Sequence, residues 1–193
     1  MIKIPQGTGV IISIVGEHAG ESLEEIFARK RGEIRKTGRA FWLYKSHSAK
    51  PDVVQNLAKA NNEETLCLFI GASSRGGARP TKHQDRMKYY SYDRANWEEV
   101  PDGILVTGTD RAAFGLILKE IEPTNELIDL WDYSNFVRQN EPLKFRLGDS
   151  TLPATKNSSS NHPERMKSPI RRIIAVAKLA RPYGLWLEKS PEF

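Results

Sequence analysis

The chain has 193 residues, of which 39% are hydrophobic, and carries a formal net charge of +5 with an isoelectric point near 9.3. The length is typical of a single domain, residues 1–193, that buries a core without disulfide bonds. The single cysteine, Cys67, excludes an internal disulfide framework or a paired-cysteine metal site, and the apolar runs are too short to span a bilayer. With no apolar signal segment at the N-terminus, we expect a cytoplasmic protein without membrane contact. The positive charge favours an anionic partner such as nucleic acid.

The chain opens with a strand and a helix. The β-branched run at 10–15 predicts a buried strand. Ser22 and Glu25 form an S-x-x-E capping box that predicts a helix as far as about Lys36, and Gly38 is placed to end it. One face of this helix is apolar, and the other is densely basic: Arg29, Lys30, Arg31, Arg35 and Lys36.

The next elements repeat this alternation. AFWLYKS at 40–46 predicts a second strand, Pro51 suits the first turn of a second helix, and LCLFIGA at 66–72 predicts a third strand. A long glycine-containing loop follows at 73–88, and its cations suit phosphate binding because guanidinium groups hold phosphate oxygens in pairs. The backbone-binding residues that we predict here are Arg75, Arg79, Lys82 and Arg86; an ordinary solvated loop is the alternative.

The remainder of the chain is rich in short strands. We predict strands at 89–93, 103–109, 113–122, 143–147, 171–180 and 183–188, with a strand or short helix at 126–133. The strands at 103–109 and 113–122 flank a short turn and are expected to pair with each other. The segment 148–170 is rich in Ser, Asn and Pro and predicts a second long basic loop. Arg165 and Lys167 in this loop, and Arg171 directly after it, would contact phosphates. The fold class is therefore α+β: a curved mixed β-sheet or partial barrel with two or three packed helices. The alternative is a three-layer α/β fold.

Aromatic residues lie close to the basic segments. On an extended strand, Trp42 and Tyr44 share one face, and Tyr90 and Trp131 belong to later aromatic groups. Aromatic rings interleaved with cations suit base stacking, so we predict that these four residues bind a base. The alternative for each ring is an ordinary place in the core.

The run AFWLYKS, the following SAKPDVVQNLAKA, the strand TLCLFIG and the later PLKFRLGD together resemble domains of the PUA-like fold, including the EVE and YTH groups. The resemblance covers about half of the chain. It implies a curved sheet and an aromatic cage for an extruded or modified base, with Trp42 and Trp131 as candidates for the cage.

A second resemblance competes with the first. VGEHAG at 15–20 looks like the strand-end motif of uracil-DNA glycosylases, and SNHPERM at 160–166 resembles their histidine-containing loop. This resemblance implies that Glu17 positions a water molecule and that His162 donates to the departing base. The motif lacks the family's proline, and the spacing between the two segments is longer.

Hydrolysis of an N-glycosidic bond requires a carboxylate near the sugar and a donor for the leaving base. Glu17, Asp132 and Asp149 are the candidate acids, each with an alternative as a surface or turn residue. The four histidines are too scattered to predict a metal site, and we expect no cofactor.

Both resemblances involve taking a base out of its stack and reading it in a pocket. We therefore predict a protein that binds nucleic acid, expected to be DNA, extrudes a modified base and cleaves its glycosidic bond, with defence against foreign modified DNA as the role suggested by analogy. The alternatives are a non-catalytic reader of modified nucleic acid and a protein that inhibits a nucleic-acid enzyme.

Overall fold

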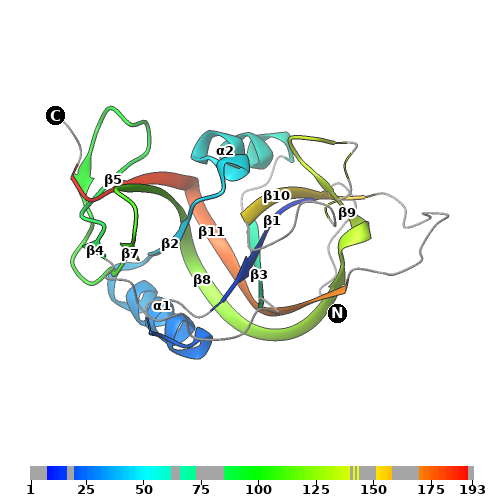
Figure 1. The fold of residues 1–193 in the computed structure, drawn as a ribbon, viewed down its shortest axis with the longest axis horizontal. Helices are drawn as coiled ribbons and strands as arrows, with labels where there is room; N and C mark the ends of the chain where they lie inside the picture. The colour runs from blue at the N-terminus through cyan, green and yellow to red at the C-terminus, as the bar shows by residue number, and fades with distance from the viewer. Residues whose placement is uncertain are drawn as a thin grey trace.

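The computed structural model describes residues 8–16, 20–61, 66–72, 85–139, 141, 143, 151–157 and 170–190. Within these ranges the chain is α+β, with helices α1 (Leu23–Thr37) and α2 (Pro51–Ala60) packed on a nine-stranded mixed sheet (Figure 1). The main path of the sheet runs β2-β8-β11-β3-β1-β10-β9 and does not close on itself, while β5 and β6 extend it from β11. The α+β class with a curved mixed sheet is confirmed.

The strands of this sheet are β1 (Gly9–Val15), β2 (Ala40–Tyr44), β3 (Cys67–Ala72), β5 (Tyr89–Ser91), β6 (Glu98–Glu99), β8 (Ala112–Asp129), β9 (Tyr133–Asn135), β10 (Thr151–Lys156) and β11 (Ile170–Glu188). A separate ladder joins β4 (Asp85–Arg86) to β7 (Thr107–Gly108), and the short 3-10 turns are η1 (His47–Ala49) and η2 (Leu130–Asp132). Among the ladders of the described residues, β1 and β3 pair in parallel and the others are antiparallel.

Helix α1 begins and ends where the sequence predicts. The Ser22 side chain accepts a hydrogen bond from the Glu25 backbone, and the Glu25 carboxylate accepts one from the Ser22 backbone at 2.7 Å. Gly38 ends the helix with a φ of 78°, a left-handed conformation that glycine adopts without steric cost. Helix α2 starts at Pro51, which needs no partner for an N–H group in the first turn.

Two long strands replace several shorter predicted ones. β8 continues through Pro123: β2 pairs with 114–118, and no other described segment forms a ladder with the outer edge of β8 at the proline. β11 continues through the cis Arg181-Pro182 bond, within a register shift between Leu179 and Gly184. The two prolines, which favour separate short strands in the sequence, therefore lie inside the continuous strands β8 and β11. Figure 1 shows β8 and β11 curving as a pair around β1 and β3.

Part of the predicted loop 148–170 is a strand. β10 pairs with β1 over Thr151–Thr155, and the hydroxyls of Ser13 and Thr151 are 2.7 Å apart. The loop prediction was wrong here. Pro153 and the polar residues around it are typical of a loop, but pairing with β1 keeps the segment extended as a strand. The predicted strand pair of 103–109 with 113–122 was also wrong, since β7 pairs with β4 and β8 pairs with β2 and β11.

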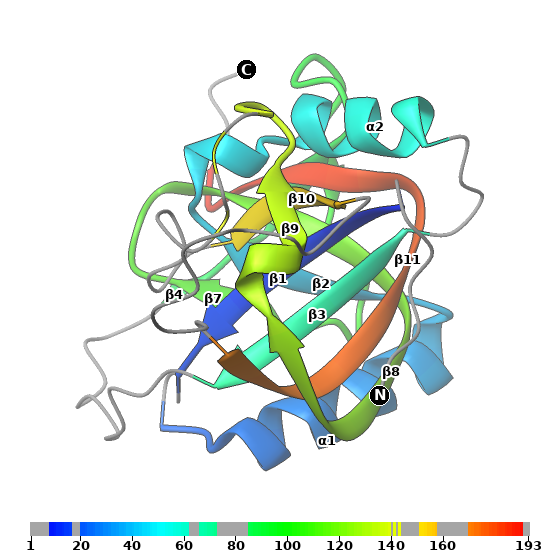
Figure 2. The ribbon, with the colours of Figure 1, turned by 90° about the vertical axis from the view of Figure 1, so that its right-hand side faces the viewer.

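Both helices pack on one core cluster. It includes Ile26 and Phe27 from α1 and Val54 and Leu57 from α2, all buried. Figure 2 shows α1 and α2 on opposite sides of the sheet. Within the described part of the chain, no helix is long and apolar enough to cross a membrane.

Candidate ligand cavity

A cavity of about 270 Å³ lies between α1, β2, the end of β1 and the segment 104–107. Its lining combines apolar walls with a few polar groups: Ile14, Val15, Gly16, Leu23, Ile26, Arg29, Lys30, Phe41, Trp42, Leu43, Leu105, Val106 and Thr107. Leu105 is 39% exposed, so the cavity reaches the surface of the protein.

The open sheet explains where this cavity forms. β2 is the last strand of the main path, and among the described residues its outer edge has no ladder partner. Val15 and Gly16, at the carboxyl end of β1, also line the cavity, and α1 supplies a further wall. The space is therefore left where the sheet fails to close.

A polar network holds the segment 104–107 against α1. Arg29 Nη1 donates to Glu33 Oε1 at 2.9 Å and to the Leu105 carbonyl at 3.1 Å. Lys30 Nζ donates to Glu33 Oε2 at 2.8 Å and to the same carbonyl at 2.9 Å. The Leu105 N–H returns a hydrogen bond to Glu33 Oε1 at 3.2 Å, and Arg29 Nε donates to Glu21 at 2.8 Å.

The two cations of this network have pKa values shifted in opposite directions. Lys30 is 4% exposed, and burial lowers the pKa of its ammonium to about 8 although the neighbouring Glu33 favours the charged form. The pKa of Arg29 is raised, chiefly by its hydrogen bonds to Glu21. Lys30 belongs to the densely basic helix face noted in the sequence, but it is buried and pairs with Glu33, which lies one turn later inside the protein.

Trp42 belongs to the cavity wall. Phe27 stacks beside its ring, with centroids 6.3 Å apart and planes 23° from parallel, and the ring is 6% exposed. A ligand in the cavity can therefore meet the margin of Trp42 but not a whole face. Tyr44, on the same strand, is buried with its hydroxyl donating to the Ala49 carbonyl, and burial raises its pKa.

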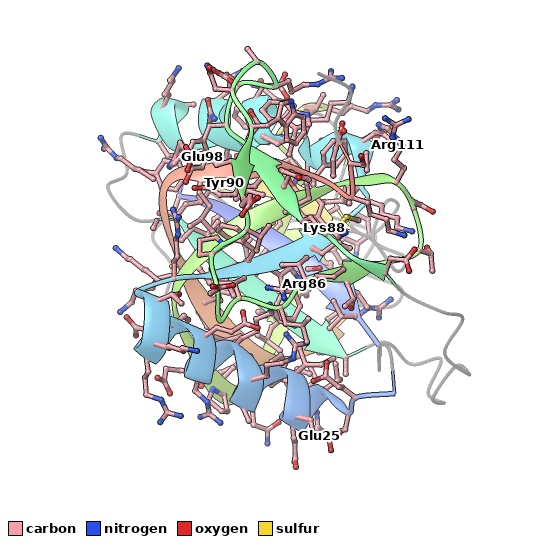
Figure 3. All side chains as sticks on the ribbon, turned by 90° about the vertical axis from the view of Figure 1, so that its left-hand side faces the viewer. Glu25, Arg86, Lys88, Tyr90, Glu98 and Arg111 are labelled. Carbon is pink, nitrogen blue, oxygen red and sulfur yellow. The ribbon has the colours of Figure 1, made fainter. Side chains whose placement is uncertain are left out.

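Tyr90 lies in a different cluster. Arg39 stacks over the rings of Phe41 and Tyr90, at 5.4 Å from each centroid, and donates to the Tyr90 hydroxyl at 3.2 Å. That hydroxyl donates to Glu98, whose proximity Figure 3 shows. Burial, with this hydrogen bond to Glu98, raises the pKa of Tyr90 to about 12. Tyr90 does not line the cavity.

Trp131 and Asp132 are outside the cavity lining too. Both belong to η2, at the β9 end of the sheet. Lys156 Nζ donates to Asp132 Oδ2 at 3.1 Å, and Asn157 donates to the Trp131 carbonyl at 3.0 Å. The four aromatic residues predicted to bind a base are thus not gathered at one site.

Two of the predicted phosphate-binding residues can be placed. Arg86, in β4, is exposed and donates to the Ile104 carbonyl at 3.2 Å, next to the segment that lines the cavity. Figure 3 shows Arg86, Lys88 and Arg111 on one face of the protein. Arg171, at the start of β11, is half-buried and donates to the Ile170 carbonyl at 3.3 Å.

The other predicted site residues lie outside the described residues: Glu17, Arg75, Arg79, Lys82, Asp149, His162, Arg165 and Lys167. Within the described ranges, no group of three or more His, Cys, Asp or Glu side chains is arranged to hold a metal ion.

The polar network was not predicted as a site from the sequence: Lys30, Arg29, Glu33 and Leu105. The spacing of Arg29 and Glu33, four residues apart, was the available signal, because such residues are neighbours on a helix. The contribution of Leu105 comes from a segment more than seventy residues later and has no local pattern.

Comparison with models of protein families, with curated proteins and with solved structures gave no match for this chain. The site's chemistry therefore carries the functional argument by itself.

Proposed function

We propose that this protein binds nucleic acid and takes one extruded, modified base into the cavity between α1 and β2. The cavity beside Trp42 is the observation that carries this proposal. Its volume of about 270 Å³ is below the usual range of roughly 300–1,000 Å³ for sites that hold drug-sized ligands. A space of this size suits a single heterocycle better than a whole nucleotide.

The walls match the two chemical features of a base. Ile26, Phe41 and Val106 provide apolar contact for ring faces, and Lys30 and Thr107 provide polar groups for a ring edge. Trp42 adds the margin of an aromatic ring. Base–aromatic stacking contributes about 1–3 kcal/mol, and the small exposure of Trp42 places its share at the lower end of that range.

Binding must also offset the cost of extrusion, which is a few kcal/mol. Phosphate contacts contribute affinity that is independent of sequence. Arg86 and Lys88 are exposed cations on one face, and Arg86 donates to the carbonyl of Ile104, the residue before the lining residue Leu105. This arrangement supports contact with a strand whose base enters the cavity.

Cleavage of the glycosidic bond would depend on Glu17. Gly16 lines the cavity and Glu17 follows it directly in the sequence. Glu17 lies outside the described residues, and it is the residue predicted from the sequence to stabilise a positively charged sugar and orient water. Among the described lining residues there is no carboxylate, so a reader that captures the base without cleaving it is the second candidate function.

Two measurements separate these functions. Affinity for single-stranded and duplex DNA should fall steeply with salt if the protein contacts phosphates, and an affinity that is independent of salt would exclude both candidates and favour a protein partner. An abasic-site assay on modified and unmodified DNA then tests cleavage. Glu17→Gln should reduce base release by roughly 10²–10⁴-fold, with Asp132→Asn and Asp149→Asn as matched controls. If no DNA tested releases a base, the cleavage proposal fails and the non-catalytic reader of modified bases becomes the proposed function.

A further inference from the structure

We propose that Lys30 is a reactive amine that forms a reversible imine with an aldehyde on a small planar heterocycle held in the cavity. This inference deepens the proposed function and rests on it for the origin of the aldehyde, which would be a formyl group on the captured base. The reactivity of the amine itself can be measured without nucleic acid.

The geometry leaves one position on the Lys30 nitrogen for a ligand. An ammonium group has three N–H donors, and among the described residues Nζ has two acceptors, Glu33 Oε2 at 2.8 Å and the Leu105 carbonyl at 2.9 Å. If the remaining proton leaves, both hydrogen bonds persist and the lone pair takes the third position. Lys30 lines the cavity, so a ligand there can meet this nitrogen.

Burial favours loss of that proton, whereas the carboxylates near Lys30 favour its charged form. Arg29 and Glu33 face it from α1, Glu21 is bonded to Arg29, and the segment 104–107 presents only the Leu105 backbone. Arg29 disfavours the charge on Lys30, Glu33 and Glu21 favour it, and the effect of burial is larger than that of any of these neighbours. Burial lowers the pKa of Lys30 to about 8, and a desolvated lysine in an apolar pocket is a typical carbonyl nucleophile.

The reaction is balanced without an oxidant or a reductant. The Lys30 lone pair attacks the aldehyde carbon and forms a C–N bond as the C=O π bond breaks, and one of the two N–H protons of the neutral amine passes to the carbonyl oxygen, which becomes a hydroxyl. Glu33 is placed to take an N–H proton and to return it to the departing hydroxyl, because the two groups are 2.8 Å apart. Loss of water leaves the imine, and addition of water reverses the reaction.

The test uses the whole protein, pyridine-4-carbaldehyde and sodium cyanoborohydride, which reduces an imine to a stable amine, followed by mass-spectrometric mapping of labelled lysines. A pKa of about 8 gives a far larger neutral fraction at neutral pH than the ordinary 10.5. After allowance for lower intrinsic nucleophilicity, Lys30 should react about tenfold faster than an exposed lysine. Lys178 is the matched reference, because it is exposed and its hydrogen bonds to Glu120 raise its pKa.

Lys30→Met should remove the fast label, and Lys178→Met should leave it unchanged. Mapping of the unmodified protein keeps the test decisive if Lys30→Met does not fold. Faster labelling of Lys30 than of Lys178 supports the proposal. Equal labelling rates for the two lysines, or no labelling of Lys30, overturn it. Failure here would leave base capture standing, whereas failure to bind nucleic acid would leave the reactivity of Lys30 standing.

Discussion

Replacing Lys30 with methionine should change how the stability of the protein depends on pH. The pKa of Lys30 is about 8 in the folded protein against an ordinary value of 10.5. Between these values the unfolded chain binds more protons than the folded one, so this group makes the free energy of unfolding rise with pH. Below about pH 8 the full cost of burying the charge is present, and above about 10.5 it is absent.

The magnitude follows from the size of this shift. Each pKa unit corresponds to about 1.4 kcal/mol, so the whole interval is about 3 kcal/mol. About 2 kcal/mol of it should fall between roughly pH 7 and pH 10. Methionine keeps an unbranched chain without the amine, while Glu33 retains its hydrogen bonds from Arg29 and Leu105.

Urea unfolding of both proteins across this pH range provides the measurement. The difference between their free energies of unfolding should rise in favour of the unmodified protein as pH increases. Other titrating groups, including Tyr44, Tyr90 and Tyr133 with their raised pKa values, cancel in this difference. Lys178→Met is the control, because the pKa of Lys178 is raised and its contribution has the opposite sign. If the difference in free energy of unfolding between the unmodified protein and Lys30→Met stays constant or falls as pH rises, the lowered pKa of Lys30 is refuted.

Four further changes test other parts of the account. Ser22→Ala removes the side-chain half of the capping box and should lower the free energy of unfolding by about 1 kcal/mol in a urea titration, with Ser190→Ala as an exposed control. Gly71→Ala should cost roughly 1–3 kcal/mol, because a new Cβ would lie 2.7 Å from the Ile14 side chain and 3.1 Å from the Arg172 carbonyl; an unchanged unfolding midpoint would contradict this close packing of β3. Arg86→Ala should reduce the slope of log affinity for DNA against log salt by about 0.9 if Arg86 contacts one phosphate, whereas Lys178→Ala should not. Combined replacement of Arg75, Arg79 and Lys82 should reduce that slope by about 2.7 on the same reasoning, and an unchanged slope would remove the loop 73–88 from the DNA-binding surface.

The sequence predicted the elements that have local signals. The Ser22–Glu25 box, Gly38 and Pro51 each act within one helical turn, and the structure confirms the helix ends that they imply. The β-branched and apolar runs of β1 and β3 were likewise recognisable. The long strands β8 and β11 were not, because Pro123 and Pro182 interrupt the pattern and only pairing with distant strands keeps the chain extended.

The cavity was less predictable than the fold. Trp42 was selected from its strand and does line the cavity, but Tyr90 and Trp131 belong to other clusters. In the sequence, Lys30 is one of several cations on a densely basic helix face. Its burial depends on Leu105, whose backbone reaches it across a separation of 75 residues, and no local pattern encodes that contact.

A cycle that removes the base and fills the cavity tests the central claim most directly. Affinity is measured for oligonucleotides with a base at one position, drawn from a panel of modified and unmodified bases, and for the same strand with an abasic site there. Both are compared for the unmodified protein and for Val15→Phe, which places a larger side chain in the cavity wall. The account predicts that at least one base in the panel increases affinity and that Val15→Phe abolishes this increase while the abasic strand binds both proteins equally. An increase that survives in Val15→Phe, or no increase with any base, would contradict capture of a base in this cavity.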